Sequence, residues 1–282
     1  MKKQSEENHF MNIIFDIGGT NMRVAVGDKK GALKPAVLPT PQDFNRAIKQ
    51  FAGMAKKIAK GKRINFCVGG VPGPLNGQKT ELLNAPNLPR WNNKPFAKAI
   101  AKALKCRVIL ENDASLAGLG EAIFGAGRNK KIVAYLIVGT GVGGARIVKG
   151  KIDENIFGFE PGHQIIAENK GQPRTLESLI GGKSLEKRYG KIATEITSRV
   201  VWEKELKYLA FGVNNLIVHW SPDIVVLGGP LIRKTKQLKV SEIFAEIKKI
   251  NKIFPKLPEI KKSQLGDPAG LYGALAILKK LR

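Results

Sequence analysis

Apolar and polar positions in the first forty residues follow the short period of β-strands. The segments NIIFDIGG, NMRVAVGD and ALKPAVLP are apolar or alternating, and they cover residues 12–19, 21–28 and 32–39. Gly-Asp and Lys-Gly pairs separate the second segment from the third, which is typical of turns between antiparallel strands. We therefore expect an antiparallel meander of two or three strands.

Further along the chain, helical spacing alternates with apolar runs. The spacing predicts helices at residues 41–61, 91–105, 114–127, 176–190, 201–220 and 269–282. Apolar runs predict strands within residues 64–74, 107–115, 130–152 and 221–230, and residues 153–176 form a loop-rich section. Strands and helices alternate throughout, so the predicted fold class is α/β.

The opening rhythm of strand, glycine turn and strand returns in KKIVAYLIVGTGVGGARIVKGKI, residues 130–152. Two such segments predict a duplicated fold in which each half has its own glycine loop. Several backbone N–H groups that point at one spot bind a phosphate well, and glycine lets the backbone come close. Both loops lack the Gly-Lys-Ser/Thr ending of a Walker loop, and a strand follows each of them, which disfavours a Rossmann dinucleotide site.

The two loops supply the candidate phosphate-binding residues. These are Gly18, Gly19, Thr20, Asn21, Gly139, Thr140, Gly141 and Gly143. A hairpin turn is the simpler interpretation of either loop by itself. Two loops at equivalent positions, one of them preceded by Asp16, favour the phosphate-binding interpretation.

Composition narrows the class of protein. The chain has 282 residues, 43% of them hydrophobic, which is enough for one large or two ordinary globular domains. The first ten residues, MKKQSEENHF, lack an apolar segment that could act as a signal sequence. No uncharged apolar run approaches the roughly 18 residues that span a bilayer. Cys67 and Cys106 are the only cysteines, which favours a reducing compartment. We expect a cytoplasmic protein without a membrane partner.

The chain is strongly basic, because its 48 lysines and arginines outnumber its 23 acidic residues and give a net charge of +25. Such a charge indicates either a polyanionic partner or a lysine-rich surface that keeps the protein in solution. The lysines are scattered over every segment, and the basic tracts lack the interleaved aromatics of a single-strand binder. We therefore expect no specific nucleic acid, while a phosphate-rich small substrate fits both interpretations.

Seven segments stand in the order seen in the ROK family of sugar kinases, within the actin-like ATPase and hexokinase superfamily. They are DIGGTNMRVAV, VGGVPGPLNG, ENDASLAGLGE, VGTGVGGARIVKG, FEPGH, SPDIVVLGGP and AGLYGALAIL. The chain resembles this family from about residue 12 to its end. The resemblance implies a two-domain, duplicated ribonuclease H-like fold with a smaller domain at 1–111 and a larger one at 112–268. It also implies that the helix at 269–282 packs back on the smaller domain, and that sugar binds between the domains.

By resemblance, Asp113 is the general base that takes the proton from the sugar hydroxyl, although an Asp before ASLAGLGE also suits a helix N-cap. Asn112 then exchanges hydrogen bonds with the sugar ring, while Glu111 serves the structure. Pro72 and Gly73 shape the sugar side of the site. Asp16 is the partner of Mg²⁺, through water, because a carboxylate beside phosphates needs a divalent cation between them.

The resemblance implies that Glu160 accepts a hydrogen bond from a sugar hydroxyl and that His163 donates one to a sugar hydroxyl. Glu177 corresponds to a third sugar-contacting carboxylate of the family. Gly228 and Gly229 form the loop against the adenosine, and a strand-ending turn is the simpler alternative for them. Many ROK members have a zinc site of one histidine and three cysteines just after the histidine, but AENKGQPRTLESLIGG contains no cysteine. We therefore expect no zinc, and another device must brace that loop.

The resemblance implies a kinase that transfers the γ-phosphate of ATP, with Mg²⁺, to a hexose, with the 6-OH of glucose as the expected acceptor. Fructose, mannose or an N-acetylhexosamine are alternative acceptors, and polyphosphate is an alternative donor. The family also contains repressors with a helix-turn-helix domain before the first glycine loop, where only 11 residues precede Asn12 here. A sugar sensor without catalysis is the remaining alternative. The sequence leaves the oligomeric state open, with a homodimer as one candidate because family members are often dimers.

Overall fold

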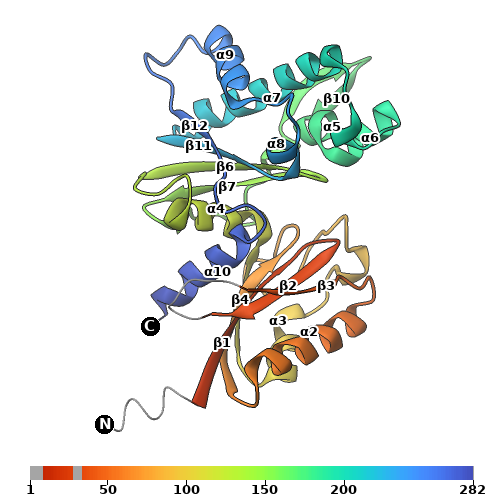
Figure 1. Cartoon of the computed structure of the whole chain (residues 1–282), viewed down its shortest axis with the longest axis vertical. Coiled ribbons are helices and arrows are strands. Elements are labelled where there is room, and N and C mark those ends of the chain that lie inside the picture. The colour runs from red at the N-terminus through yellow and green to blue at the C-terminus, as the bar shows by residue number, and fades with distance from the viewer. Residues whose placement is uncertain (1–8, 28–33, 282) are drawn as a thin grey trace. The chain divides into compact units, whose positions relative to one another are not determined.

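The computed structural model describes residues 9–27 and 34–281, which separate into two compact units (Figure 1). Unit 1 contains the described residues of Met1–Gly120, Glu154–Gly158 and Pro268–Arg282. Unit 2 contains Glu121–Asp153 and Phe159–Asp267. Each unit has a five-stranded mixed sheet with helices packed on it, so the predicted α/β class is confirmed.

Unit 1 is built on a sheet with the strand order β3-β2-β1-β4-β5. Its strands are β1 (Phe10–Ile17), β2 (Asn21–Val26), β3 (Ala36–Pro39), β4 (Arg63–Val71) and β5 (Arg107–Asn112). Its helices are α2 (Phe44–Ala59), α3 (Phe96–Leu104), the start of α4 (Asp113–Phe124) and α10 (Ala269–Lys280). Strands β1, β2 and β3 form the predicted antiparallel meander. The Lys-Gly pair expected to separate β2 from β3 lies outside the described residues.

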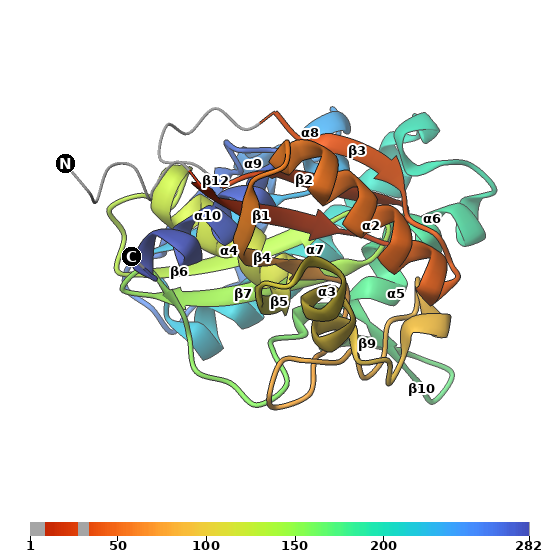
Figure 2. The ribbon, with the colours of Figure 1, turned by 90° about the horizontal axis from the view of Figure 1, so that it is seen from below.

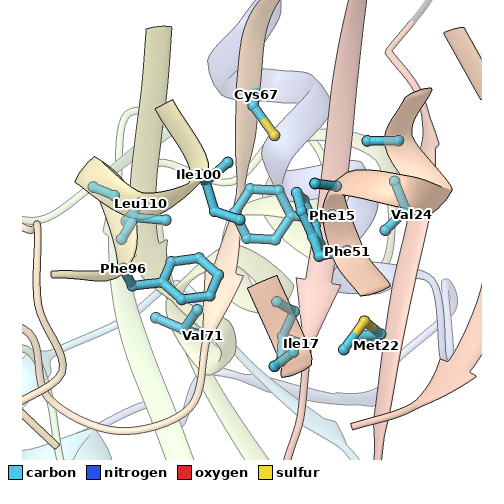
Figure 3. Packing of buried hydrophobic residues seen from close by; sticks show 14 of the residues in the cluster. Phe15, Ile17, Met22, Val24, Phe51, Cys67, Val71, Phe96, Ile100 and Leu110 are labelled. Carbon is cyan, nitrogen blue, oxygen red and sulfur yellow. The ribbon is translucent and has the colours of Figure 1, made fainter. Parts of the chain in front are cut away.

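Strand β1 is buried on both faces, which explains its nearly continuous apolar sequence. Ile13, Phe15 and Ile17 pack against α2 and α3, and the rings of Phe15 and Phe51 meet edge-on at 5.0 Å (Figure 3). Ile14 points to the other face, where it joins the core formed with α10. Figure 2 shows α2 and α3 on one side of β1, and α10 on the other. Asp16 shares the parity of Ile14 and hence lies on the α10 face.

Helix boundaries follow local capping chemistry. The carboxylate of Asp43 accepts a hydrogen bond from the N–H of Arg46 at 2.7 Å and so caps α2, which ends at Lys60 in the left-handed conformation. The helix predicted at 91–105 is shorter than expected. It begins only at Phe96, because Pro95 disfavours helical backbone in the residue before it and occupies the N-cap position.

Unit 2 repeats the topology of unit 1 with the strand order β12-β11-β6-β7-β8. Its sheet contains β6 (Ile132–Val138), β7 (Val142–Val148), β8 (Lys151–Ile152), β11 (Ile224–Gly228) and β12 (Glu259–Lys262). Its helices are α5 (Leu176–Ile180), α6 (Gly182–Tyr189), α7 (Arg199–Trp220), α8 (Pro230–Lys234) and α9 (Val240–Ile250). In both sheets the first strand pairs antiparallel with the second and parallel with the fourth, which confirms the predicted duplication.

Some elements were not predicted. The loop-rich section contains a separate hairpin, β9 (Ile165–Asn169) and β10 (Gln172–Thr175), together with the short 3-10 helix η3 (Pro161–His163). Helix α9 and strand β12 were missed too. The four residues of β12, EIKK, are mostly exposed at the edge of the sheet, where no alternation marks a strand. None of the described helices combines the length and hydropathy needed to cross a membrane.

Candidate active site

The hairpin between β1 and β2 presents backbone donors at its tip. The N–H of Gly18 donates to the carbonyl of Asn21 at 2.9 Å and closes the turn. Thr40 donates its hydroxyl to the carbonyl of Gly18 and its N–H to the carbonyl of Thr20, both at 2.8 Å. Among the described residues, no acceptor binds the N–H groups of Gly19 and Thr20. The carbonyls of Gly18, Thr20 and Asn21 are therefore occupied, while two N–H donors of the turn have no acceptor among the described residues.

The hairpin between β6 and β7 has the same arrangement with different supports. The N–H of Gly139 donates to the carbonyl of Gly141 at 2.9 Å. The link between α5 and α6 occupies two carbonyls, since Gly182 donates to Gly139 at 2.8 Å and Lys183 to Thr140 at 3.1 Å. The N–H groups of Thr140 and Gly141 have no acceptor within residues 9–27 and 34–281. Both turns thus offer a pair of N–H donors to an anion.

Asp16 lies at the carboxyl end of β1, beside the first hairpin. Its carboxylate is 3.5 Å from the guanidinium of Arg23, its partner in the β1–β2 register, and its side chain is 14% exposed. Gly270, in the first turn of α10, lies so close that an added Cβ would be 3.0 Å from the carboxylate. The positive end of the α10 dipole therefore stabilises the negative charge of Asp16.

The groups around Asp16 fit a magnesium ion that is bound mainly through water and phosphate oxygens. No group of three or more histidine, cysteine or acidic side chains could hold a metal within the described part of the chain. Mg²⁺ bound to phosphate substrates commonly takes one or two carboxylates, several waters and the phosphate oxygens. One carboxylate next to a donor-rich turn fits this set, with Asp16 as the residue that would hold the ion.

The junction of β5 and α4 brings Asn112 and Asp113 together with the loop that follows β4. The amide oxygen of Asn112 accepts from the N–H of Ser115 at 3.0 Å, and its amide nitrogen donates to the carbonyl of Gly73 at 3.2 Å. Asn112 is therefore the residue that caps α4. Asp113 accepts from the N–H of Ala114 at 2.8 Å and is half-buried.

The loop at Pro72 and Gly73 is fixed by its own backbone. Gly73 has φ of 94°, and a Cβ there would be 2.4 Å from the carbonyl oxygen of Asn84. A side chain at this position is thus excluded by conformation and by space. Glu111, just before Asn112, is buried and forms an ion pair with Lys79. This pair holds the end of β5 against the same loop region.

Glu160, His163 and Glu177 come together in unit 2, as a sugar-contacting set would require. Partial desolvation by the surrounding protein raises the pKa of Glu160, although the residue keeps exposed surface. The charge of His163 lowers this pKa, and the carboxylate of Glu177 raises it. The three groups are therefore close enough to influence one another, and His163 is exposed.

Glu177 connects this cluster to the second hairpin. It lies in the first turn of α5, which is capped by the hydroxyl of Thr175. Its carboxylate accepts from the N–H of Val142 at 2.7 Å. A Cβ at Gly141 would be 2.3 Å from the same carboxylate, so glycine is needed there for contact with the protein itself. One oxygen of Glu177 thus positions the hairpin.

The loop after His163 is braced by the β9–β10 hairpin and by Gln164. The amide nitrogen of Gln164 donates to the carbonyl of Pro161 at 2.8 Å, and its oxygen accepts from Asn215 of α7 at 2.9 Å. The carbonyl of Gln164 accepts from the N–H of Leu176 at 2.9 Å. These bonds connect the residue just before β9 to α7 and to Leu176 within the segment AENKGQPRTLESLIGG, where many ROK members have zinc ligands.

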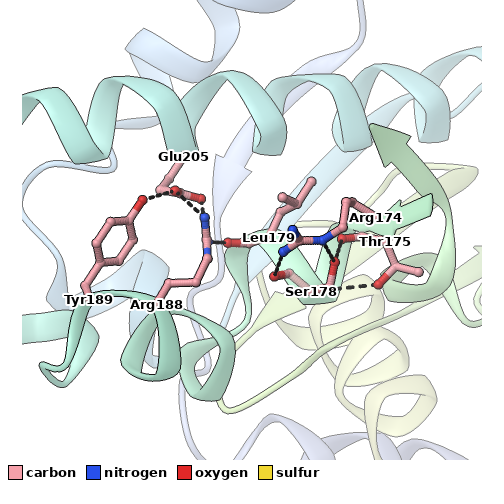
Figure 4. A network of polar contacts seen from close by, with 7 residues as sticks. All are labelled: Arg174, Thr175, Ser178, Leu179, Arg188, Tyr189 and Glu205. Atoms are coloured by element: carbon pink, nitrogen blue, oxygen red, sulfur yellow. Dashed lines mark hydrogen bonds and ion pairs between the residues drawn. The ribbon is translucent and has the colours of Figure 1, made fainter. Parts of the chain in front are cut away.

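A buried ion pair between α6 and α7 supports α5 (Figure 4). Glu205 of α7 is 1% exposed, and both its oxygens accept from the guanidinium of Arg188 at 3.0 Å. Arg188 also donates to the carbonyl of Leu179 in α5. Tyr189 donates its hydroxyl to Glu205 at 2.7 Å, and burial together with this bond raises the pKa of Tyr189 to about 12. The network fixes the helix that carries Glu177.

Gly228 and Gly229, at the end of β11, are closely packed. A Cβ at Gly228 would be 2.4 Å from the hydroxyl of Tyr135, and one at Gly229 would be 2.2 Å from the carbonyl oxygen of Val138. Gly229 also has φ of 92°. Their glycine identity thus follows from packing within unit 2, and contact with a nucleotide stays a prediction.

Comparison with known proteins identifies the family. The model of the ROK family matches residues 13–281. The chain belongs to the ROK family. The glucokinase of Thermotoga maritima is 26% identical to this chain, over 94% of this chain and 96% of the relative. The N-acetylgalactosamine kinase AgaK of Shewanella sp. strain ANA-3 is 28% identical over 92% and 94%.

Solved structures show the same fold. The crystal structure of a ROK hexokinase from Thermus thermophilus matches 96% of this chain and 99% of its own, with a TM-score of 0.81 and 26% identity. ROK sugar kinases have the actin-like ATPase fold, and this ROK protein has it too. The resemblance inferred from the seven motifs is therefore confirmed.

Several supporting residues escaped the sequence analysis. Arg23, Thr40 and Gln164 support site residues through polar contacts between different elements, which no local pattern marks. Glu205 had a detectable signal, because it interrupts the apolar stripe of α7 between Trp202 and Leu209. A charged residue inside a buried stripe indicates a paired charge.

Proposed function

We propose that this ROK protein is a sugar kinase that transfers the γ-phosphate of ATP to a hexose hydroxyl, with the 6-OH of glucose as the principal acceptor. The observation that carries the proposal is the environment of Asp113. Asn112 takes over the capping of α4, and Asp113 places a half-buried carboxylate at the strand end as the proposed acceptor of the substrate proton. Kinase relatives over nearly the whole chain support the same conclusion.

In the proposed reaction, Asp113 accepts the hydroxyl proton as the sugar oxygen forms its bond to the γ-phosphorus, and the bond to the ADP oxygen breaks. Asn112 keeps Asp113 at the start of α4. Glu160 and Glu177 accept hydrogen bonds from sugar hydroxyls, and His163 donates one. Orienting the acceptor in this way gives the sugar an advantage over water.

The phosphates bind to the two hairpins in this proposal. Gly19, Thr20, Thr140 and Gly141 supply the N–H donors described above. Asp16 would hold Mg²⁺, which when bound supplies charge neutralisation for the phosphate oxygens. Arg23 forms an ion pair with the carboxylate of Asp16 at 3.5 Å and so orients it.

A coupled assay of ADP formation tests the proposal, with glucose, fructose, mannose, N-acetylglucosamine and N-acetylgalactosamine as acceptors. We expect the highest kcat/KM with glucose and ATP. A direct assay of sugar phosphate, with polyphosphate in place of ATP, tests whether polyphosphate is the donor. Sugar binding without turnover on every acceptor and both donors would instead establish a non-catalytic sensor.

An N-acetylhexosamine is the second candidate acceptor. The relative AgaK, at 28% identity, is named for N-acetylgalactosamine, while the Thermotoga relative at 26% is named a glucokinase. The same screen decides between them by the ratio of kcat/KM for N-acetylglucosamine and glucose. A ratio above one would replace glucose by the acetylated sugar in the proposal.

A further inference from the structure

Unit 1 has a second charged feature at the opposite end of its sheet from the first hairpin. A hollow of about 760 Å³ lies where β1, β4 and β5 begin and where α2 and α3 end. We call it the basic hollow. Its charged lining residues are Lys56, Lys62, Arg63, Lys105 and Arg107. Phe10, at the start of β1, also lines it, and the seven residue steps to Ile17 separate the hollow from the hairpin by about 23 Å.

Within the described part of the chain, the five cations of the basic hollow have no acidic partner. None of them forms an ion pair within residues 9–27 and 34–281, and no acidic residue is among the lining residues. The carboxyl-terminal ends of α2 and α3 contribute about half a negative charge each. Five positive side chains therefore leave a net charge of about +4 in the hollow.

The equivalent position in unit 2 is built differently, although the fold is the same. A hollow of about 530 Å³ there is lined by Lys130, Lys131 and Lys256, but also by Asp223 and Glu259. Glu259 pairs with Lys130, and hydrogen bonds from Lys130 and Lys261 lower the pKa of Glu259 to about 2. Among the described residues, Lys130 in the hollow of unit 2 thus has an acidic partner, whereas the cations of the basic hollow have none.

We propose that the basic hollow of unit 1 binds a small anion with a chain of phosphate groups. Its volume lies in the range of small-molecule sites. Arg63 and Arg107 supply planar guanidinium groups that bind phosphate with two hydrogen bonds, and the lysines supply point charges around them. The source of the phosphate chain is either a free oligophosphate or a nucleoside triphosphate. Phe10 is 49% exposed and is placed to stack with a base in the second case.

Cys106 provides a reporter inside the basic hollow. It lines the hollow and is partly exposed, whereas Cys67 is fully buried behind it. A hydrogen bond from Cys67 lowers the pKa of Cys106, which favours its reaction with a neutral alkylating reagent. An anion bound in the hollow covers this thiol and slows its alkylation. Phosphate bound at the glycine hairpins does not cover Cys106 and therefore leaves its alkylation rate unchanged.

The experiment measures the rate of alkylation of Cys106 by iodoacetamide in the full chain, with mass spectrometry to assign the modified cysteine. Tripolyphosphate is the probe, at low ionic strength because salt screens exposed charges. We expect saturable protection of Cys106, with half-protection at a concentration about tenfold higher in the Arg63→Gln/Arg107→Gln double variant. Each rate is compared with that of the same variant without tripolyphosphate.

The matched control is Lys131→Gln/Lys256→Gln in the hollow of unit 2, which removes the same charge and should leave protection unchanged. ATP and tripolyphosphate are then compared in the wild type and in Phe10→Ala. Tighter protection by ATP that Phe10→Ala abolishes identifies a nucleotide, and equal protection identifies a free oligophosphate. Three outcomes would overturn the proposal. They are the absence of saturable protection of Cys106, an equal weakening of that protection in both double variants, and protection by an RNA oligonucleotide alone.

Discussion

The two glycine hairpins share a backbone and differ in what surrounds it. In unit 1, Thr40 binds the carbonyls of the turn, and in unit 2 the α5–α6 link does so. Asp16 precedes the first hairpin and pairs across the strands with Arg23, whereas Ile137 and Gly143 occupy the corresponding register in unit 2. The carboxylate at the second hairpin comes from Glu177, on a distant helix.

The carboxyl ends of β5 and β12, which occupy equivalent places in the two sheets, also differ in their side chains. Register places Gln264 and Leu265, after β12, at the positions that Asn112 and Asp113 occupy after β5. The N–H groups of Gln264 and Leu265 donate to the buried carboxylate of Glu121 at 3.1 and 2.8 Å. The duplicated backbone therefore keeps a glycine turn in both units, while the candidate base Asp113 has no carboxylate counterpart at the equivalent position of unit 2.

The largest expected effect concerns this asymmetry at the strand ends. Asp113→Asn keeps the shape of the α4 start but removes the proton acceptor, so kcat should fall by about a thousandfold. The coupled assay measures turnover, and calorimetry should show that sugar still binds. Asp43→Asn is the matched control, because asparagine also caps α2, and it should keep wild-type kcat. Wild-type turnover in Asp113→Asn would remove the base from the mechanism.

The next largest effect separates the two ion pairs that support the site. Arg188→Met leaves Glu205 buried and unpaired, which should reduce the free energy of unfolding by about 3 kcal/mol. Lys79→Met removes a partner that is 39% exposed, so the loss should be about 1 kcal/mol or less. Urea unfolding followed by circular dichroism gives both values. Equal losses would show that burial does not distinguish the two supports.

A smaller effect compares the tips of the hairpins. Thr20 and Thr140 are both exposed and adjoin the unpartnered N–H groups. If both turns bind phosphate, Thr20→Val and Thr140→Val should each raise KM for ATP about fivefold with little change in KM for sugar. An increase in only one variant would assign the phosphate chain to one hairpin. Unchanged KM in both would contradict the phosphate role of the hydroxyls.

The smallest effect is a shift in pH dependence. Desolvation and the charge of Glu177 raise the pKa of Glu160, so its accepting form is lost on acidification at a higher pH than in an ordinary glutamate. Glu177→Gln should lower that pKa and move the acidic rise of KM for sugar to lower pH. His163→Asn removes a charge that lowers the pKa and should move it to higher pH. KM measured across pH decides, and shifts in the same direction would exclude the coupling.

Much of the site was predictable because its residues fall at strand ends marked in the sequence. DIGGTN and GTGVGG stand after apolar runs, and ENDAS stands at a strand-to-helix junction, so their order indicated the family and the duplicated fold. Residues that act across elements gave no such signal. The β9–β10 hairpin, with its short polar strands, and the cap formed by Asn112 were both missed.

The sequence by itself determined most strands and helices, the two glycine turns and the candidate carboxylates, because the side-chain periods of 2 and 3.6 residues are local properties. The tertiary structure decided which groups became partners. It placed Glu177 on Val142, Arg23 on Asp16 and Arg188 on Glu205, and it left five cations of the basic hollow without acids among the described residues. The physical reason is that hydrogen bonds and ion pairs depend on distances of a few ångströms between segments that are far apart in the chain.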